Sequence, residues 1–241
     1  MTPRIADIWV YLSASPLLGL TITLLAYQGA YWLYRRTNFN PLLNPVLLAI
    51  IMLVAALKLT NTPYQTYFDG AQFVHFLLGP ATVALAVPLY AQSDKLRALL
   101  LPLGGALLAG SLTAIISVLG IGWLLGAGET TLLSLAPKSV TAPIAMGISE
   151  KIGGIPSLTA VLVIMTGVSG AMMAKYVLDA LRVRDHGVRG FAVGVAAHGI
   201  GTARAFQLSE EAGAFAGLGM GLNGLLTAIL MPLMLALWRL F

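Results

Sequence analysis

The chain has 241 residues, of which 58% are hydrophobic and only 10% are charged. This composition excludes a water-soluble domain, because soluble domains carry roughly 25% charged residues to cover their surface. Cysteine is absent, which excludes disulfides and thiolate chemistry, and the three histidines lack the spacing of metal ligands. We therefore expect no metal and no other cofactor. The net charge of +5 comes largely from short gaps between apolar runs, which is the pattern of a membrane protein rather than of a nucleic-acid-binding protein.

Six apolar runs come close to the ~20 residues that a helix needs to cross the bilayer core. They cover residues 8–32, 41–59, 72–91, 96–125, 156–178 and 215–240. The first run is too long for the apolar region of a signal peptide, which has ~7–15 residues. We predict an all-α polytopic membrane protein of the inner (plasma) membrane, with one transmembrane domain. Its N-terminal helices occupy 1–127, and its C-terminal part occupies 128–241.

Basic residues in the gaps predict the orientation of these spans. Cytoplasmic loops are enriched in Lys and Arg, so the loops at Arg35, Lys95 and Arg184 are expected inside and the loop 61–67 outside. These assignments agree with one another only if the chain between the fourth and fifth spans returns to the side from which it entered.

Two polar segments interrupt the apolar pattern, at 135–154 and at 196–217. Charges, prolines and glycines of this kind cannot face lipid, whereas a broken or re-entrant helix beside a protein-lined cavity can contain them. The segments align: Thr141-Ala142 matches Thr202-Ala203, and residues 149–154 match 209–214 with one gap. Each precedes one apolar span. We predict inverted repeats, with a binding site where the two breaks meet.

Four stretches of the sequence, three of them in the C-terminal part, resemble the LrgB/CidB family. They are LLGPATVALAVPLY (77–90), PKSVTAPIAM (137–146), SEKIGG (149–154) and AHGIGTARA (197–205), and the pair Asn44-Pro45 also fits. The resemblance extends from about residue 40 onward and implies two competing functions. Bacterial members are described as antiholin-like regulators of murein hydrolases that act with a small LrgA/CidA-type membrane partner. Plant members resemble plastid glycolate/glycerate transporters, and some bacterial systems are linked to pyruvate movement.

The polar broken segments favour transport, because an oligomeric membrane lesion has no use for a charge-matched cavity within one subunit. We predict an alternating-access, proton-coupled transporter of a small monocarboxylate such as glycolate, glycerate, pyruvate or lactate, which forms a homo-oligomer in the lipid bilayer. The alternative is a holin/antiholin-like regulator that assembles with a small LrgA/CidA-type protein. We expect no enzyme activity, since the sequence lacks GxSxG and HExxH motifs and paired intramembrane aspartates.

Two cations are the candidate ligands of the substrate carboxylate. A buried ammonium at Lys138 requires an anion, although a lysine at the interface can also snorkel to water. A guanidinium at Arg204 binds carboxylate through two parallel hydrogen bonds, although it can instead pair internally with Glu150 or Glu210.

Neutral and titratable groups complete the predicted site. The substrate-binding set is Lys138, Ser139, Thr141, His198, Gly201, Thr202, Arg204 and Asn44, and the proton-coupling set is His198, Glu150 and Glu210. Glycine at 201 lets backbone amides approach an anion, and His198 titrates near neutral pH. Each group has a structural alternative: hydroxyls and Asn44 can satisfy backbone groups, His198 can be a buried donor, and the carboxylates can lie in solvated turns.

Overall fold

A computed structural model describes residues 16–37, 39–40, 43–77, 80 and 83–238 of the chain. Within these ranges every regular element is a helix. The helices are α2 (Pro16–Arg36), α3 (Pro45–Leu59), α4 (Tyr64–Phe76), α6 (Ala86–Ala91), α7 (Ser93–Leu124), α8 (Glu129–Leu135), α9 (Ala142–Ile152), α10 (Pro156–Ala180), α11 (His186–Leu208) and α12 (Glu210–Trp238).

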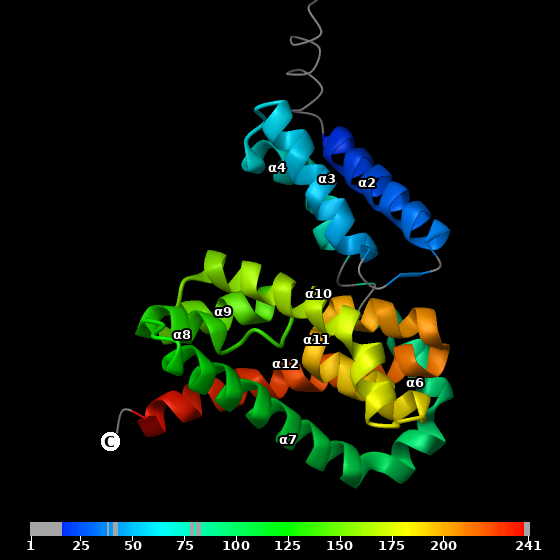
Figure 1. Ribbon diagram of the computed structural model, residues 1–241, viewed down its shortest axis with the longest axis vertical. Coiled ribbons are helices and arrows are strands. Elements are labelled where there is room, and N and C mark those ends of the chain that lie inside the picture. The colour runs from blue at the N-terminus through cyan, green and yellow to red at the C-terminus, as the bar shows by residue number, and fades with distance from the viewer. Residues whose placement is uncertain (1–15, 38, 41–42, 78–79, 81–82, 239–241) are drawn as a thin grey trace, which may run out of the picture. The chain divides into compact units, whose positions relative to one another are not determined.

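The chain divides into two compact units, whose boundary in the sequence lies between Ala84 and Leu85. In the first unit, α2 packs against both α3 and α4 (Figure 1). Gly19 permits the close approach of α2 to α4, because a Cβ atom there would lie 2.8 Å from the backbone of Gly70 and Ala71. This unit is therefore a small helical bundle with its own contacts.

Three helices are long and apolar enough to cross a membrane: α7, α10 and the stretch Glu210–Ala236 of α12. A shorter apolar helix, α3, has 15 residues. These helices support the predicted all-helical membrane protein, but they do not establish the predicted count of six full spans. Residues 8–15 of the first predicted span lie outside the described residues.

The predicted continuous span over 72–91 does not form. Helix α4 ends at Phe76, turns interrupt the chain at Leu77 and Leu85, and α6 has only six residues. Pro80 offers the physical reason, because proline lacks the amide hydrogen of a helical bond and clashes with the preceding turn. The predicted loop 61–67 is also shorter than expected, since α4 already begins at Tyr64.

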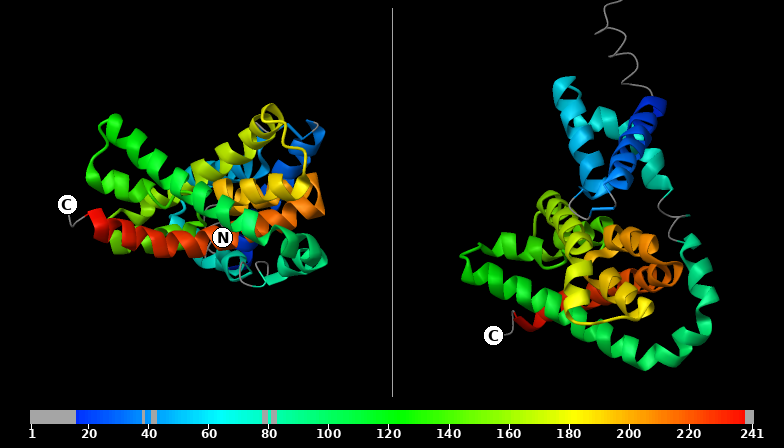
Figure 2. Two further views of the ribbon diagram at one scale, coloured as in Figure 1. Left: turned by 90° about the horizontal axis from the view of Figure 1, so that it is seen from below. Right: turned by 45° about the vertical axis from the view of Figure 1, so that its right-hand side comes forward.

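In the second unit, α11 and α12 lie against each other along much of their length. Small residues permit this contact. A Cβ atom added at Gly190 would collide with the carbonyl group of Ala212, and one added at Gly194 would collide with that of Ala216. Helix α7 belongs to the same unit and is visibly bent (Figure 2). It contains Pro102, and proline is a common cause of helix kinks.

The same order of elements occurs twice in this unit. Helix α8 leads into the non-helical segment 136–141, then α9, a tight turn and the long helix α10. Helix α11 is interrupted at Ala197 and His198, continues to Leu208, and a turn at Ser209 leads into the long helix α12. Both predicted polar segments therefore contain non-helical backbone. That the two copies are related by inversion stays a prediction.

The serines aligned in the predicted repeat both stabilise these tight turns. The hydroxyl of Thr159 donates to Ser149 Oγ at 2.7 Å, which joins α10 to the end of α9. The hydroxyl of Ser209 accepts the amide of Ala212 at 3.1 Å and bonds His186 Nδ1 at 2.7 Å. The matching positions thus have matching local roles.

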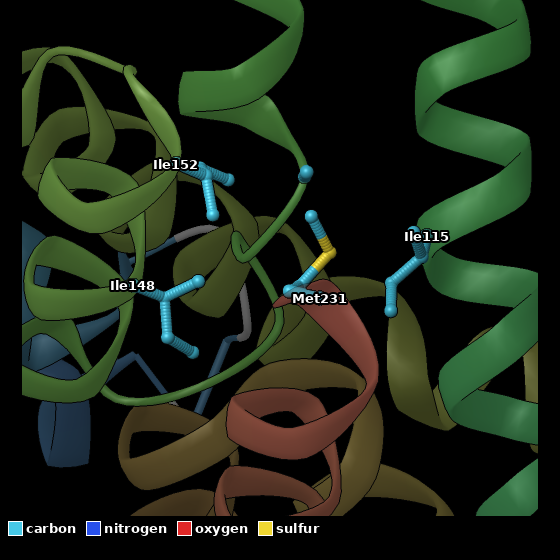
Figure 3. Close-up of a cluster of buried hydrophobic side chains, with 5 residues drawn as sticks. Ile115, Ile148, Ile152 and Met231 are labelled. Atoms are coloured by element: carbon cyan, nitrogen blue, oxygen red, sulfur yellow. The ribbon is translucent and has the colours of Figure 1, made fainter. Parts of the chain in front are cut away.

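A hydrophobic cluster holds the first break against its neighbours. Ile148 and Ile152 of α9 point toward Met231 of α12, and Ile115 of α7 approaches Met231 from the other side (Figure 3). Ala136, the first residue of the break, belongs to the same cluster. Burial of these side chains anchors segment 136–141 between three helices.

Candidate functional site

Asn223 of α12 joins the two breaks through its side-chain amide. Its Nδ2 donates to the carbonyl oxygen of Ser139, in the first break, at 3.1 Å. The same nitrogen donates to the carbonyl oxygen of Val195, just before the second break, at 3.0 Å. Its Oδ1 accepts from the hydroxyl of Ser111 on α7 at 2.5 Å. Asn223 therefore joins the first polar segment to the residue that precedes the second one, inside the second unit.

His198 forms the second break itself. Its backbone has φ 40° and ψ −136°, a left-handed conformation that a residue with a side chain rarely adopts. Its ring Nε2 lies 2.9 Å from the carbonyl oxygen of Val163 on α10. Because a carbonyl only accepts, Nε2 carries the proton, and Nδ1 is the acceptor of the neutral ring. Strain of this kind persists only where the surrounding structure holds it in place.

Glycines make room for this strained backbone. A Cβ atom at Gly167 would lie 2.6 Å from Cε1 of the His198 ring, and one at Gly170 would lie 2.6 Å from Cβ of Ala197. Gly201 is buried against Ala197 and Val193, and its predicted role in exposing backbone amides to an anion stays a prediction. Small residues of α10, Gly167 and Gly170, thus allow the second break to pack closely against that helix.

The predicted hydroxyls have different surroundings. Thr202 donates to the carbonyl oxygen of His198 at 2.9 Å and so satisfies a backbone group at the break. Ser139 is buried, and its Oγ lies 3.2 Å from Lys138 Nζ. Thr141 precedes the first turn of α9, where its side chain makes no capping hydrogen bond. Of the three, Ser139 and Thr141 are the hydroxyls at the first break.

Lys138 is the cation of this region. Its side chain is partly buried, and its Nζ contacts the hydroxyl of Ser139. Within the described ranges, the ion pairs involve Lys95 and Arg189, and Lys138 has no carboxylate partner. The next residue, Ser139, accepts a hydrogen bond from Asn223 through its carbonyl oxygen. We call Lys138, Ser139, His198, Thr202 and Asn223 the break cluster.

Four other predicted residues lie outside the break cluster. Arg204 donates to Gln207 Oε1 at 2.8 Å, one turn further along α11. Glu150, near the end of α9, and Glu210, at the start of α12, are exposed, and their role as proton carriers stays a prediction. Asn44 belongs to the first unit, where its Oδ1 caps α3 by accepting the amide of Val46 at 2.9 Å. The structural alternative accounts for Asn44.

Sequence reasoning did not include Asn223 or Ser111 in the site. Both are almost completely buried, with about 1% of their surface exposed. The available signal was a polar side chain within a long apolar span, which is costly in a membrane unless it is paired. Among the described residues, no group of three or more His, Cys, Asp or Glu side chains could hold a metal ion.

A second polar cluster ties together the ends of three elements. Lys95 Nζ, near the start of α7, lies 2.5 Å from Asp185 and 2.6 Å from Glu211. Asp185 also accepts the amide of Val188 and so caps α11. The ammonium of Lys95, followed by this amide, lowers the pKa of Asp185 below its usual value. These contacts join the starts of α7, α11 and α12.

Together, the apolar helices and the two joined breaks define the class of an all-helical membrane protein with paired interrupted helices. The LrgB-like family model matches residues 23–237, so the chain belongs to the LrgB family. Its relatives include uncharacterized proteins YwbG and YxaC of Bacillus subtilis, 37% and 36% identical over 91% of this chain and 97% and 95% of theirs. Antiholin-like protein LrgB of Bacillus cereus is 31% identical, over 91% of this chain and 95% of that protein. No solved structure matches the chain.

Proposed function

We propose that the break cluster binds a small anion and that this protein carries a small monocarboxylate across the membrane. The observation that supports the proposal is the partly buried ammonium of Lys138, which lies at a helix break without a carboxylate partner among the described residues. A cation removed from water is costly unless an anion compensates it. A substrate carboxylate would supply that charge.

The neighbours of Lys138 fit a carboxylate of small size. Ser139 offers a hydroxyl beside the ammonium, and Thr141, the N-cap residue of α9, makes no capping hydrogen bond to the first turn, in which Pro143 has no amide hydrogen. The start of a helix carries a partial positive charge and free amide hydrogens, both of which favour an anion. We infer a one-carboxylate substrate of the glycolate, glycerate, pyruvate or lactate type, and proton coupling through His198.

A second candidate function is regulation of murein hydrolases together with a small LrgA/CidA-type membrane protein. The specific observation is the printed name of the Bacillus cereus relative, antiholin-like protein LrgB. The names of the relatives favour this function over transport, because none of them refers to a substrate. Transport is favoured only by the chemistry of the break cluster.

One experiment with two arms separates the candidates. Purified full-length protein is reconstituted in liposomes, and uptake of labelled glycolate and pyruvate is compared with that of protein-free liposomes. The transport proposal predicts saturable uptake by this chain alone. Uptake equal to that of empty liposomes rejects it. In the second arm, murein hydrolase activity is measured in cells with and without the protein, each with and without a small LrgA-type protein, and a dependence on both supports regulation.

A further inference from the structure

One side chain, that of Asn223, forms hydrogen bonds to both break regions of the second unit. Asn223 is about 1% exposed and lies in the apolar helix α12. Each hydrogen of its amide nitrogen is directed to a different break, at Ser139 and at Val195. Its oxygen accepts from Ser111 at 2.5 Å and more weakly from Thr227 at 3.4 Å. The hydrogen-bonding capacity of the side chain is therefore fully used.

The two carbonyl groups lie at or next to places where the backbone departs from a regular helix. Ser139 lies in the non-helical segment between α8 and α9. In a regular helix the carbonyl of Val195 would accept the amide of Gly199, but the non-helical dihedrals of Ala197 and His198 lie between them. A carbonyl buried in a membrane protein needs another donor, and Asn223 supplies one to each break.

Only a primary amide suits this position. Two donors and an acceptor on one short side chain occur in asparagine, whereas serine and threonine have one donor and an ionised aspartate has none. An aspartate would also place a negative charge against two carbonyl oxygens. The chemistry of residue 223 is thus set by the need to bond two separate segments at once.

We propose that Asn223 is a latch that keeps the two breaks closed on each other, and that either break moves only when its bond to Asn223 opens. This inference rests on the proposed function in one respect, because opening of the breaks is the motion through which a substrate would pass. Asn223 is then a positioning residue, which acts through the breaks without contacting the substrate.

The test uses the natural absence of cysteine. A single reporter cysteine replaces Val140, which is about 1% exposed in the first break, and a matched control cysteine replaces Ser149, which is fully buried within the following helix α9. Labelling by a small thiol reagent is timed in purified full-length protein. Asn223→Ala should raise the labelling rate at position 140 by about tenfold or more, the effect of two lost hydrogen bonds, and leave the rate at position 149 unchanged.

Two further variants sharpen the test. Ser111→Ala keeps both carbonyl bonds and should raise labelling at position 140 less than Asn223→Ala does. Asn223→Ser, which retains one donor, should give an intermediate rate and serves where Asn223→Ala does not fold. An unchanged rate at position 140, or an equal increase at positions 140 and 149, overturns the latch. If the parent protein shows no uptake, the transport function is rejected. The latch is still supported in that case, provided that Asn223→Ala raises the labelling rate at position 140.

Discussion

The imidazole of His198 donates from Nε2 to the carbonyl oxygen of Val163 at 2.9 Å, across from α11 to α10. This bond holds a residue whose φ of 40° is otherwise unfavourable. It also fixes the neutral tautomer, so that Nδ1 is the nitrogen able to take up a proton. One hydrogen bond therefore stabilises the backbone conformation of the second break and leaves Nδ1 of His198 available for the proposed proton coupling.

Adding one methyl group beneath this ring should disturb the break. Gly167→Ala would place a Cβ atom 2.6 Å from Cε1 of His198, so the ring or α11 must shift. Overpacking of this kind costs about 1–3 kcal/mol, and we expect a lower unfolding temperature in detergent. Gly104→Ala is the matched control, since nothing lies within 4 Å of the new Cβ atom. Equal unfolding temperatures of the two variants would contradict the close packing of the His198 ring against Gly167.

The hydrogen bond and the titration of His198 can be separated by substitution. His198→Gln keeps an amide donor for Val163 but cannot titrate near neutral pH, so uptake should lose its pH dependence while the protein stays folded. His198→Leu removes the donor as well and should destabilise the protein by about 1 kcal/mol. The measurements are uptake between pH 5.5 and 8 and thermal unfolding, with the range chosen around the usual histidine pKa of about 6.5. A pH profile of His198→Gln that matches the parent would exclude His198 from coupling.

The Lys95 cluster should contribute to stability in a pH-dependent way. The pKa of Asp185 is lowered in the folded protein, so its contribution is complete above the unfolded value near 3.8 and is lost as pH falls through the lower folded value. Lys95→Gln should therefore unfold at a lower temperature than the parent at pH 7, and the difference should shrink on acidification toward pH 3. Exposed pairs contribute about 1 kcal/mol or less, and high salt should reduce the effect. A difference that is constant with pH would argue against the pair.

Orientation in the membrane can be tested on the turn before α11. We predict that Arg184 faces the cytoplasm, because basic loops remain on that side. Arg184→Cys provides the first cysteine of the chain, and its side chain position is exposed. An impermeant thiol reagent should label it in inverted membrane vesicles and leave it unlabelled in intact cells. Labelling in intact cells would overturn the predicted arrangement of spans and the inversion of the repeats.

Part of the structure follows from the sequence alone. The charge-poor composition predicts a helical membrane protein, and prolines, glycines and charges predict both interrupted segments. The interruption within 72–91 was not predicted, because length and mean hydropathy do not register where a helix ends, here at the turns of Leu77 and Leu85. The repeat suggests that the two breaks lie close together, but it does not indicate which side chain joins them. Asn223 is identified as that side chain only by its distances to Ser139 and Val195.

Arg204 is a predicted site residue for which position in the sequence was a poor guide to its contacts. A guanidinium six residues after His198 suggests a carboxylate ligand, but the side chain of Arg204 donates a hydrogen bond to Gln207. Rotation about a helix places successive residues on different faces, so nearness in sequence to a break does not place a side chain in the break cluster. Its predicted role in binding stays a prediction.

The central claim is that Lys138 binds the carboxylate of a transported substrate. It is tested most directly by the KM for labelled pyruvate or glycolate in proteoliposomes of the parent, Lys138→Gln and Lys151→Gln, the last being an exposed lysine of the same segment. Loss of a charge-assisted bond should raise the KM of Lys138→Gln by about tenfold or more, and Lys151→Gln should match the parent. A Lys138→Gln protein that folds and transports with the KM of the parent would contradict the account.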